Sequence, residues 1–389
     1  MKLLMVHSDR DEMYGAVHSM LEMLTNLNKD YGIEPVLLVS KLGNVTDYCK
    51  KNGWKYVVTG HGNFMMGAGT KKKQFIRNTL LPLFYLKYKI KNLIALKKIE
   101  SSLDINDFDI IHTNVNVCDI GAILSKKYNI PHVWHLREFG DLDYNRIAFR
   151  KNYIKFMNEH CDYFIAISDA VKNHWVNKGL DENKIVRVYN GVEQIEYNDI
   201  KTNSQLLKCC FSGSISKSKG QYIMLEALNN LEEKYKKFIK VDIIGDGPSD
   251  YVRTLKKYIN KNNMNSMVNF LGYQPNIRQM LNRYDIGFMC SFSEGFGRVT
   301  VEYMMAGLCT IASNTGANKE LIVEDETGLF FEYPSIESLR NKIEWCIKNR
   351  KKINQIGNEA KRVSSEKYTS KNNAKNVFDI YMKIQGEKK

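Results

Sequence analysis

Short apolar runs alternate with amphipathic stretches along the first half of the chain. The runs are KLLMVH, PVLLVS, KYVV, FDIIHT, HVWHL, YFIAIS and KIVRVY, and a polar or helical pattern follows each of them. This alternation is typical of β-α units around a parallel sheet. The pattern restarts in the second half with LKCCFSG, KVDIIGDG, VNFLG, DIGFMC and LCTIAS. We therefore predict an α/β protein with two doubly wound, Rossmann-like parallel sheets.

A stretch without periodicity separates the two halves. Residues 190–204 (NGVEQIEYNDIKTNS) are rich in Asn and acidic side chains, as is usual for a linker. We predict one domain over 1–195, a second over 196–368, and a C-terminal helix over 369–389 that crosses back to the first domain. Ligands bind beyond the carboxyl ends of parallel strands, so we expect the two sheets to face a common cleft.

The most informative segment is SFSEGFGRVTVEYMMAG, residues 291–307. Glu294 follows a predicted strand, and a Gly-Phe-Gly turn then leads into a predicted helix that contains Glu302. A glycine turn at a helix start lets a phosphate approach free N–H groups and the positive end of the helix dipole. The two carboxylates can accept hydrogen bonds from sugar hydroxyls. The alternative is a surface loop with an acid near a helix start, which the dipole also favours.

A second loop carries basic residues. In FSGSISKSKGQYIMLEAL, residues 211–228, Lys219 stands just before a predicted helix, among small residues. The P-loop pattern is absent from this stretch, but a lysine and exposed amides can still bind phosphate. A solvated Lys-rich turn is the other interpretation.

The E-x(7)-E spacing with Gly-Phe-Gly inside it, followed by Ala306-Gly307 and a strand, resembles the donor motif of family 4 retaining glycosyltransferases. The resemblance covers nearly the whole chain and is firmest over 206–332. It implies the GT-B fold, with Glu294 on the transferred sugar and Glu302 on the ribose hydroxyls. The donor-binding residues that it implies are Gly15, Ser214, Lys219, Glu294, Gly295, Phe296, Gly297, Arg298, Val299 and Glu302.

The chain departs from the family pattern at two points. Ser214 stands where family members have Arg, so phosphate neutralisation must depend on Lys219, aided by Lys217 or Arg298. Tyr14 stands where many members have the first of two Gly residues, before Gly15. The helix that starts at Gly15 is either a cap for the donor phosphate or an ordinary helix start.

The strand HVWHL ends in a polar cluster of His135, Arg137 and Glu138. A histidine at a strand end is often a satisfied core residue. The resembled family has a functional His at the end of the matching strand, so we expect His135 to be catalytic together with Glu294. Arg137 and Glu138 are expected to contact the acceptor.

The formal net charge is +14, which attracts phosphates, anionic lipid or nucleic acid, although a Lys-rich composition gives the same balance without any partner. Residues 71–98 hold nine Lys or Arg and no acid, interleaved with apolar side chains. This segment either lies on an anionic membrane surface or packs on the sheet. We expect no nucleic-acid partner, because the sequence contains no recognisable nucleic-acid-binding motif.

The eight cysteines show no CxxC pair or His partner at ligand spacing, so we interpret them as reduced core thiols. The sequence has no signal or membrane-spanning segment at its start, and we expect a cytoplasmic protein, peripheral at the inner face of the membrane. No metal or other cofactor is expected, since no DxD motif follows a predicted strand.

These observations predict a retaining glycosyltransferase that moves a sugar from a nucleotide-sugar, first of all a UDP-sugar, to a saccharide or polyprenyl-linked acceptor in surface-polysaccharide synthesis. Two alternatives remain open. A nucleotide-sugar epimerase of the same fold needs no second substrate. A non-catalytic, basic membrane-binding protein explains the charge but leaves the carboxylate spacing unexplained.

Overall fold

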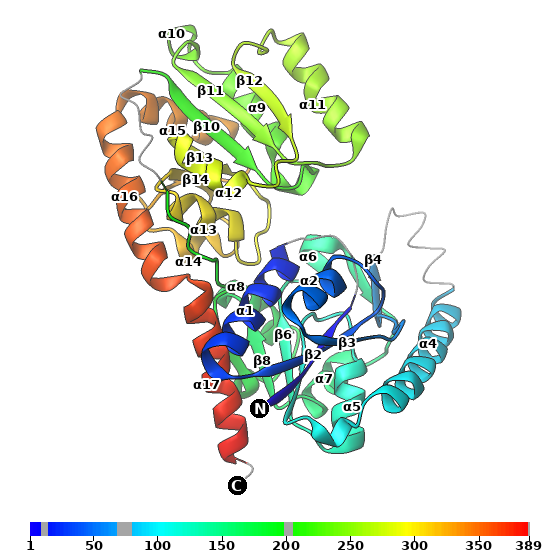
Figure 1. Ribbon diagram of the computed structural model, residues 1–389. Coiled ribbons are helices and arrows are strands. Elements are labelled where there is room, and N and C mark those ends of the chain that lie inside the picture. Colours follow the sequence, from blue (N-terminus) through cyan, green and yellow to red (C-terminus); the bar gives the residue numbers. More distant parts are fainter. Residues whose placement is uncertain (9–14, 68–79, 198–204, 388–389) are drawn as a thin grey trace. The chain divides into compact units, whose positions relative to one another are not determined.

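The computed structural model describes residues 1–8, 15–67, 80–197 and 205–387. The chain divides into two compact units, Met1–Gly191 with Ser370–Lys389, and Val192–Thr369. The predicted boundaries after 195 and 368 lie within a few residues of these limits. Each unit contains one parallel sheet with helices on both faces, and both can be followed in Figure 1.

The sheet of unit 1 has seven parallel strands in the order β3-β2-β1-β5-β6-β8-β9. Parallel strands buried on both faces are rich in apolar residues, and four of the six residues of β1 are fully buried Leu, Met or Val. The strands are β1 (Lys2–His7), β2 (Glu34–Val39), β3 (Lys55–Val58), β5 (Ile110–Thr113), β6 (His132–Leu136), β8 (Tyr163–Ala166) and β9 (Ile185–Arg187).

Helices connect these strands and cover the sheet. They are α1 (Gly15–Tyr31), α2 (Asn44–Asn52), α4 (Leu81–Ser102), α5 (Ile120–Tyr128), α6 (Asp141–Tyr144), α7 (Tyr153–Glu159) and α8 (Asp169–Asn177), with the short 3-10 turns η1 (Ile105–Asp107) and η2 (Glu182–Lys184). The last helix, α17 (Ser370–Glu387), packs against α1, and Tyr31 stacks on Phe378 with ring centroids 4.3 Å apart (Figure 1). The C-terminal segment therefore belongs to the core of unit 1.

A small antiparallel pair, β4 (Met65–Gly67) and β7 (Arg146–Ala148), lies outside the main sheet of unit 1. The sequence analysis missed it, because both strands are short and neither lies in an extended apolar or alternating run.

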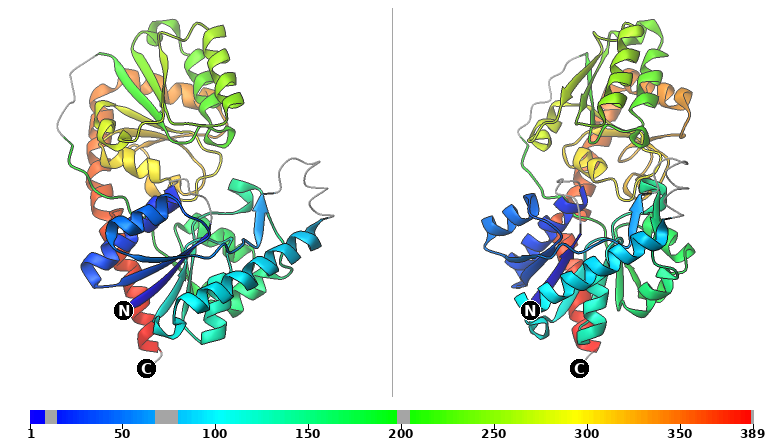
Figure 2. Two further views of the ribbon diagram at one scale, coloured as in Figure 1. Left: turned by 45° about the vertical axis from the view of Figure 1, so that its right-hand side comes forward. Right: turned by 90° about the vertical axis from the view of Figure 1, so that its right-hand side faces the viewer.

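Unit 2 has six parallel strands in the order β12-β11-β10-β13-β14-β15. These are β10 (Leu207–Ser212), β11 (Ile239–Ile244), β12 (Val268–Gly272), β13 (Ile286–Met289), β14 (Cys309–Ser313) and β15 (Leu329–Phe331). Its helices are α9 (Gln221–Asn229), α10 (Glu233–Lys236), α11 (Ser249–Lys261), α12 (Ile277–Met280), α13 (Arg298–Met305), α14 (Asn318–Leu321), α15 (Ile336–Lys348) and α16 (Arg350–Lys367), with the turns η3 (Lys217–Lys219) and η4 (Leu281–Arg283). The two views of Figure 2 show helices on both faces of this sheet.

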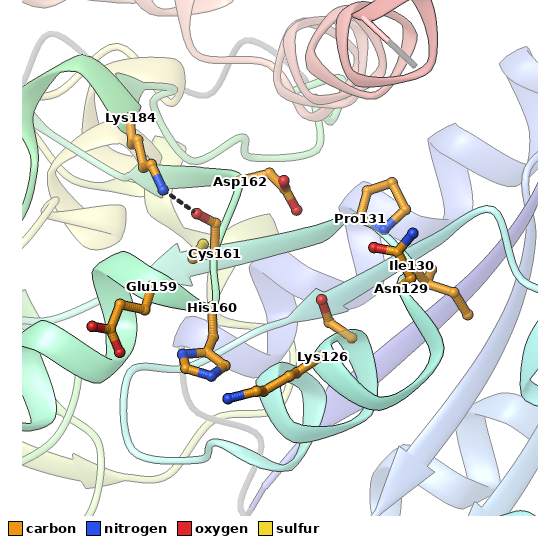
Figure 3. Close-up of a pocket in the computed structure, with 10 residues that line it drawn as sticks. Lys126, Asn129, Ile130, Pro131, Glu159, His160, Cys161, Asp162 and Lys184 are labelled. Atoms are coloured by element: carbon orange, nitrogen blue, oxygen red, sulfur yellow. Dashed lines mark hydrogen bonds between the residues drawn. The ribbon is translucent and has the colours of Figure 1, made fainter. Parts of the chain in front are cut away.

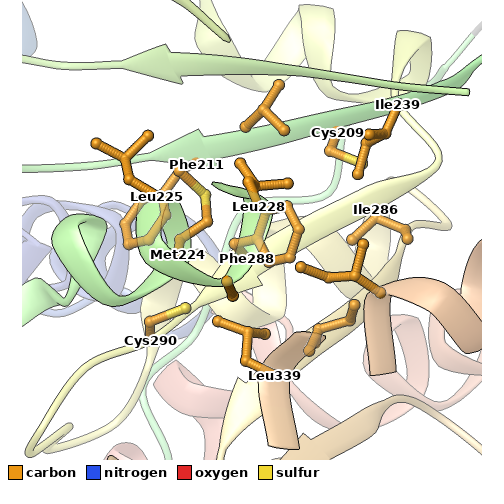
Figure 4. Packing of buried hydrophobic residues seen from close by; sticks show 14 of the residues in the cluster. Cys209, Phe211, Met224, Leu225, Leu228, Ile239, Ile286, Phe288, Cys290 and Leu339 are labelled. Carbon is orange, nitrogen blue, oxygen red and sulfur yellow. The ribbon is translucent and has the colours of Figure 1, made fainter. Parts of the chain in front are cut away.

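One face of the unit 2 sheet forms a continuous apolar core. Phe211 and Phe288 from the strands meet Leu225 and Leu228 of α9, with Leu339 of α15 beside them, and all are at most 2% exposed (Figure 4). Burying a side chain of this size contributes about 1.5–3 kcal/mol. This core fixes the loops at the carboxyl ends of β10 and β13, where the predicted donor site lies.

All eight cysteines are buried and free, as predicted. Within the part of the chain that the structure describes, no helix is both long enough and apolar enough to span a bilayer.

Candidate active site

The loop between β13 and α13 holds most of the predicted donor residues. Gly297 caps the amino end of α13 with φ = 83°, a left-handed conformation that favours glycine. The helix begins at Arg298 directly after it, so the first amides of α13 have no partner within the helix. This is a suitable position for an anion.

Two ion pairs join four of the predicted residues. The Lys219 ammonium lies 2.8 Å from a Glu294 carboxylate oxygen, and the two side chains are 32% and 14% exposed. The Arg298 Nε lies 3.1 Å from a Glu302 carboxylate oxygen, with both side chains 12% exposed. The structure thus brings Lys219, at the end of η3, to the same loop as Glu294, as expected from the order of the strands.

Glu294 is supported by the loop that follows β14. The Ala317 amide donates to the Glu294 carbonyl oxygen over 2.9 Å, and the Ser313 and Thr315 hydroxyls both donate to the Ser291 carbonyl. Among the described residues, the buried Ser293 hydroxyl has no hydrogen-bond partner. A buried polar group without a partner calls for a ligand or a water molecule. Sequence analysis overlooked Ser293, although it precedes Glu294 directly.

The other predicted residues of unit 2 lie in the same two loops. The Phe296 ring is 3% exposed and packs edge-on against Tyr368, so only its backbone is available to a ligand. Ser214 is exposed, and its carbonyl oxygen accepts a hydrogen bond from Gln221. Gly295 and Val299 are half-buried in the turn. A serine hydroxyl brings no positive charge, so the charge available in the loop after β10 comes from its lysines.

In unit 1, Gly15 is exposed and begins α1. Tyr14, on which the comparison with the family pattern partly depends, lies outside the described residues, as do residues 71–79 of the basic segment.

His135 is fully buried near the carboxyl end of β6. Its Nδ1 lies 3.2 Å from Nε2 of His112, and its own Nε2 has no hydrogen-bond partner among the described residues. Burial holds the pKa of His135 well below its usual value, and the nearby Arg137 charge adds to the effect. His135 is therefore neutral at pH 7.

Arg137 and Glu138 are held by the chain itself. The Arg137 guanidinium donates from Nε to the Asn114 side-chain oxygen over 2.7 Å and from a terminal nitrogen to Asn190. Glu138 forms an ion pair with Arg146, a residue of β7. These contacts place both residues beside the carboxyl edge of the sheet and orient Arg137 toward the strand ends.

Further polar groups at this edge were missed by the sequence analysis. His7 at the end of β1 and His61 after β3 are each 5% exposed, and each has an unpartnered Nε2 within the described residues. Asn116, after β5, has both side-chain polar atoms unpartnered in the same way. Burial lowers the pKa of His7 to about 4 and that of His61 to about 3. Each of these residues lies at or just after the end of a predicted apolar run, where a ligand site is expected, and this position could have identified them.

The hollow in Figure 3 lies at the opposite edge of the unit 1 sheet, before β6, β8 and β9. It measures about 480 Å³. The Lys184 ammonium donates to the Cys161 and Asn158 carbonyl oxygens, and Asp162 accepts from the His132 amide. Lys184 and Asp162 thus bind neighbouring backbone, and none of the predicted site residues lines the hollow. In the described part of the chain, His, Cys, Asp and Glu side chains form no cluster able to hold a metal ion.

Two Rossmann-like units in one chain, each built on a parallel sheet, are typical of glycosyltransferases of the GT-B fold. Residues 45–194 match Glycosyltransferase Family 4, and residues 193–363 match Glycosyl transferases group 1. The chain belongs to this family of glycosyltransferases.

The relatives agree with this assignment. An uncharacterized glycosyltransferase of Methanocaldococcus jannaschii is 27% identical over 66% of this chain and 71% of its own length. An α-1,4-N-acetyl-D-galactosaminyltransferase of Campylobacter jejuni, named for an undecaprenol-linked saccharide acceptor, is 27% identical over 39% of this chain and 42% of its own length. Anabaena HepE, solved in complex with UDP and glucose, superposes with a TM-score of 0.78 at 20% identity, covering 98% of this chain and all of HepE.

Proposed function

We propose that this chain is a retaining glycosyltransferase that moves a sugar from a UDP-sugar to a saccharide or polyprenyl-linked saccharide during surface-polysaccharide synthesis. The observation that carries the proposal is the pairing of Lys219 with Glu294 beside the capped amino end of α13. The UDP and glucose bound to HepE support the donor class, and the undecaprenol-linked acceptor of the Campylobacter relative supports the acceptor class.

In this proposal, unit 2 binds the donor. Lys219 and the first amides of α13 neutralise the diphosphate. Glu302 accepts hydrogen bonds from the ribose hydroxyls, and Glu294 accepts one from the transferred sugar. Because these groups already lie in fixed ion pairs, the site is preorganised for charge that develops on the leaving phosphate.

In unit 1, His135 is the residue that we propose orients the acceptor. The bond between the anomeric carbon and the phosphate oxygen breaks, and the acceptor oxygen bonds to that carbon on the same face of the ring. The acceptor proton passes to an oxygen of the departing diphosphate, so configuration is retained and the products are UDP and the extended saccharide. The positive charge comes from Lys219 and the α13 amides, and in this scheme no metal ion takes part.

The described part of the basic segment supports a peripheral contact with an anionic membrane. One face of α4, formed by Tyr88, Asn92, Ala95 and Ile99, is buried. Tyr88 and Asn92 donate to Asp119, which also pairs with Arg150 and is fully buried. Because these bonds fix the inner face of α4, its opposite face points outward.

That outward face is apolar. Leu83, Leu86, Ile90, Leu93 and Ile94 are 51–63% exposed, and they supply five of the thirteen large apolar side chains exposed in the described part of the chain. At about 100° per residue, they lie opposite the buried face. Exposed lysines flank them, at positions 87, 89, 91, 97 and 98. An apolar stripe with lysines beside it is typical of helices that lie in the membrane interface.

The proposed activity is tested with purified full-length protein, a panel of nucleotide-sugars, and polyprenyl-linked saccharides extracted from bacterial membranes. We expect release of UDP that depends on the acceptor, loss of release in Glu294→Ala, and activity that persists in EDTA. The anomeric proton coupling of the product reports whether configuration is retained. Interconversion of the donor sugar without an acceptor would instead identify an epimerase, and an inverted product would exclude the retaining mechanism.

A further inference from the structure

Three buried side chains form a hydrogen-bonded row in unit 1. The Tyr381 hydroxyl, from α17, lies 2.5 Å from Nδ1 of His112 on β5. Nε2 of His112 lies 3.2 Å from Nδ1 of His135 on β6. All three residues are 0% exposed, and the two imidazole rings are stacked with centroids 5.3 Å apart. The row ends at His135 Nε2, which has no partner among the described residues.

One arrangement of the protons along this row leaves the fewest polar groups without a hydrogen-bond partner. Within the described chain, His112 is the sole partner of the Tyr381 hydroxyl. If that hydroxyl donates to His112 Nδ1, neutral His112 carries its proton on Nε2 and donates to His135 Nδ1. His135 then carries its own proton on Nε2. The reverse direction leaves a buried phenol proton without an acceptor, which costs about 1–3 kcal/mol.

We propose that Tyr381 and His112 are positioning residues that hold His135 as the Nε2–H tautomer, so that His135 donates a hydrogen bond to a substrate oxygen. This inference rests on the proposed function, because it assumes that a sugar faces His135. A histidine held in this tautomer cannot take the acceptor proton, which therefore passes to the leaving phosphate. The C-terminal helix thus contributes a hydroxyl to the chemistry of unit 1.

The tautomer is measured directly on the full chain labelled with ¹⁵N-histidine, by long-range ¹H–¹⁵N correlation at pH 7.5. We expect His135, assigned through its loss in His135→Gln, to show a protonated Nε2 and an unprotonated Nδ1. In Tyr381→Phe, which removes one oxygen and keeps the ring, both neutral tautomers of His135 should be populated. An unprotonated Nε2 in the unaltered protein, or an unchanged spectrum in Tyr381→Phe, would overturn the proposal. This readout requires no activity, so it stands even if the proposed transfer fails.

The kinetic consequence follows from the same variant. Tyr381→Phe should lower kcat about two- to tenfold, the usual value of one hydrogen bond, with KM for the donor unchanged. Tyr284→Phe is the matched control, since its hydroxyl is also buried and donates to Asp242, in unit 2. It should leave kcat and the His135 spectrum unchanged at a similar loss of Tm. Equal effects of the two variants on kcat would show that Tyr381 acts only through packing, and would contradict its role as a positioning residue.

Discussion

Lys219 and Glu294 come from loops after two different strands, yet their charged atoms lie 2.8 Å apart. The loop after β10 carries the lysine and the loop after β13 carries the glutamate, and these strands are neighbours in the sheet. Both side chains are partly shielded from solvent. The ion pair therefore holds each group in place before any substrate binds, and a diphosphate that engages Lys219 exchanges one anionic partner for another.

Replacing either member of this pair should abolish most of the activity. Lys219→Ala and Glu294→Ala should each lower kcat/KM by more than about tenfold, or 1.4 kcal/mol, because a phosphate charge or a sugar hydroxyl loses its partner. The double variant should lose less than the product of the two single losses, since the residues interact. Lys208→Ala, at the other end of β10, is the control and should retain full activity. Strict additivity would indicate that the pair has no common role.

Glu302 should affect binding rather than turnover. The ribose is remote from the reacting carbon, so its hydrogen bonds are equally strong in the ground state and the transition state. We expect Glu302→Gln to raise KM for the donor about tenfold and to change kcat by less than about twofold. Steady-state kinetics with varied donor distinguish the two effects, and Glu337→Gln, at an exposed position of α15, is the control. A fall in kcat at constant KM would place Glu302 at the reacting centre instead.

Much of the fold could be predicted from the sequence, because the apolar runs are long and regular. All twelve runs named from the pattern contain strands of the two main sheets. The three-residue β15 is not among these runs, and β4 and β7 were missed. A short strand can be recognised when it lies in a longer apolar run, as the three-residue β9 does in KIVRVY, but β4 and β7 lie in no such run and depend on tertiary pairing.

The candidate site likewise could be predicted only in part, where its residues are close together in the sequence. The spacing of Glu294, Gly297 and Glu302 is local, so the sequence could identify their common loop. The partners of His135 are not local: His112 is 23 positions away, and Tyr381 lies 269 positions beyond His112. The apolar residues around them suggested only core packing. Contacts across that distance follow from the return of α17 to unit 1, and the helical periodicity of α17 does not reveal its contacts.

The buried histidines should make the protein less stable at acid pH. The folded pKa of His7 is about 4 and that of His61 about 3, against 6.5 when exposed, so between these values the unfolded chain binds more protons. Stability is therefore fully present above about pH 6.5 and is lost as the pH falls toward 4. At pH 5.5 each of these histidines should lower the free energy of unfolding by about 1.4 kcal/mol.

Urea unfolding at pH 7.5 and pH 5.5 measures this effect. The midpoint should fall at pH 5.5, and His61→Gln should reduce the difference between the two pH values by about 1.4 kcal/mol. Lys208→Ala, which keeps every histidine, is the control and should retain the pH difference of the unaltered chain. A pH difference that is the same in His61→Gln as in the unaltered chain would show that His61 is hydrated or charged in the folded state.

The outward face of α4 combines an apolar stripe with lysines, and vesicle binding should distinguish the contributions of these two features. Exposed lysines contribute only when the membrane is anionic, at about 1 kcal/mol each, whereas apolar side chains contribute on any bilayer. The triple variant Lys87→Gln, Lys91→Gln, Lys98→Gln should therefore lose binding to vesicles with 30% anionic lipid, a composition chosen for the assay. Leu86→Ser, Ile90→Ser, Leu93→Ser should weaken binding to neutral and anionic vesicles alike.

Helix α11 supplies a matched control for this experiment. It also carries exposed lysines, at positions 256, 257 and 261, but none of the large exposed apolar side chains of the described residues lies on it. Changing these three lysines to Gln removes the same charge and should leave vesicle binding nearly intact, because the lysines of α11 have no apolar stripe beside them to insert. Equal losses from α4 and α11 would mean that the net charge of +14, rather than the stripe on α4, brings the protein to the membrane.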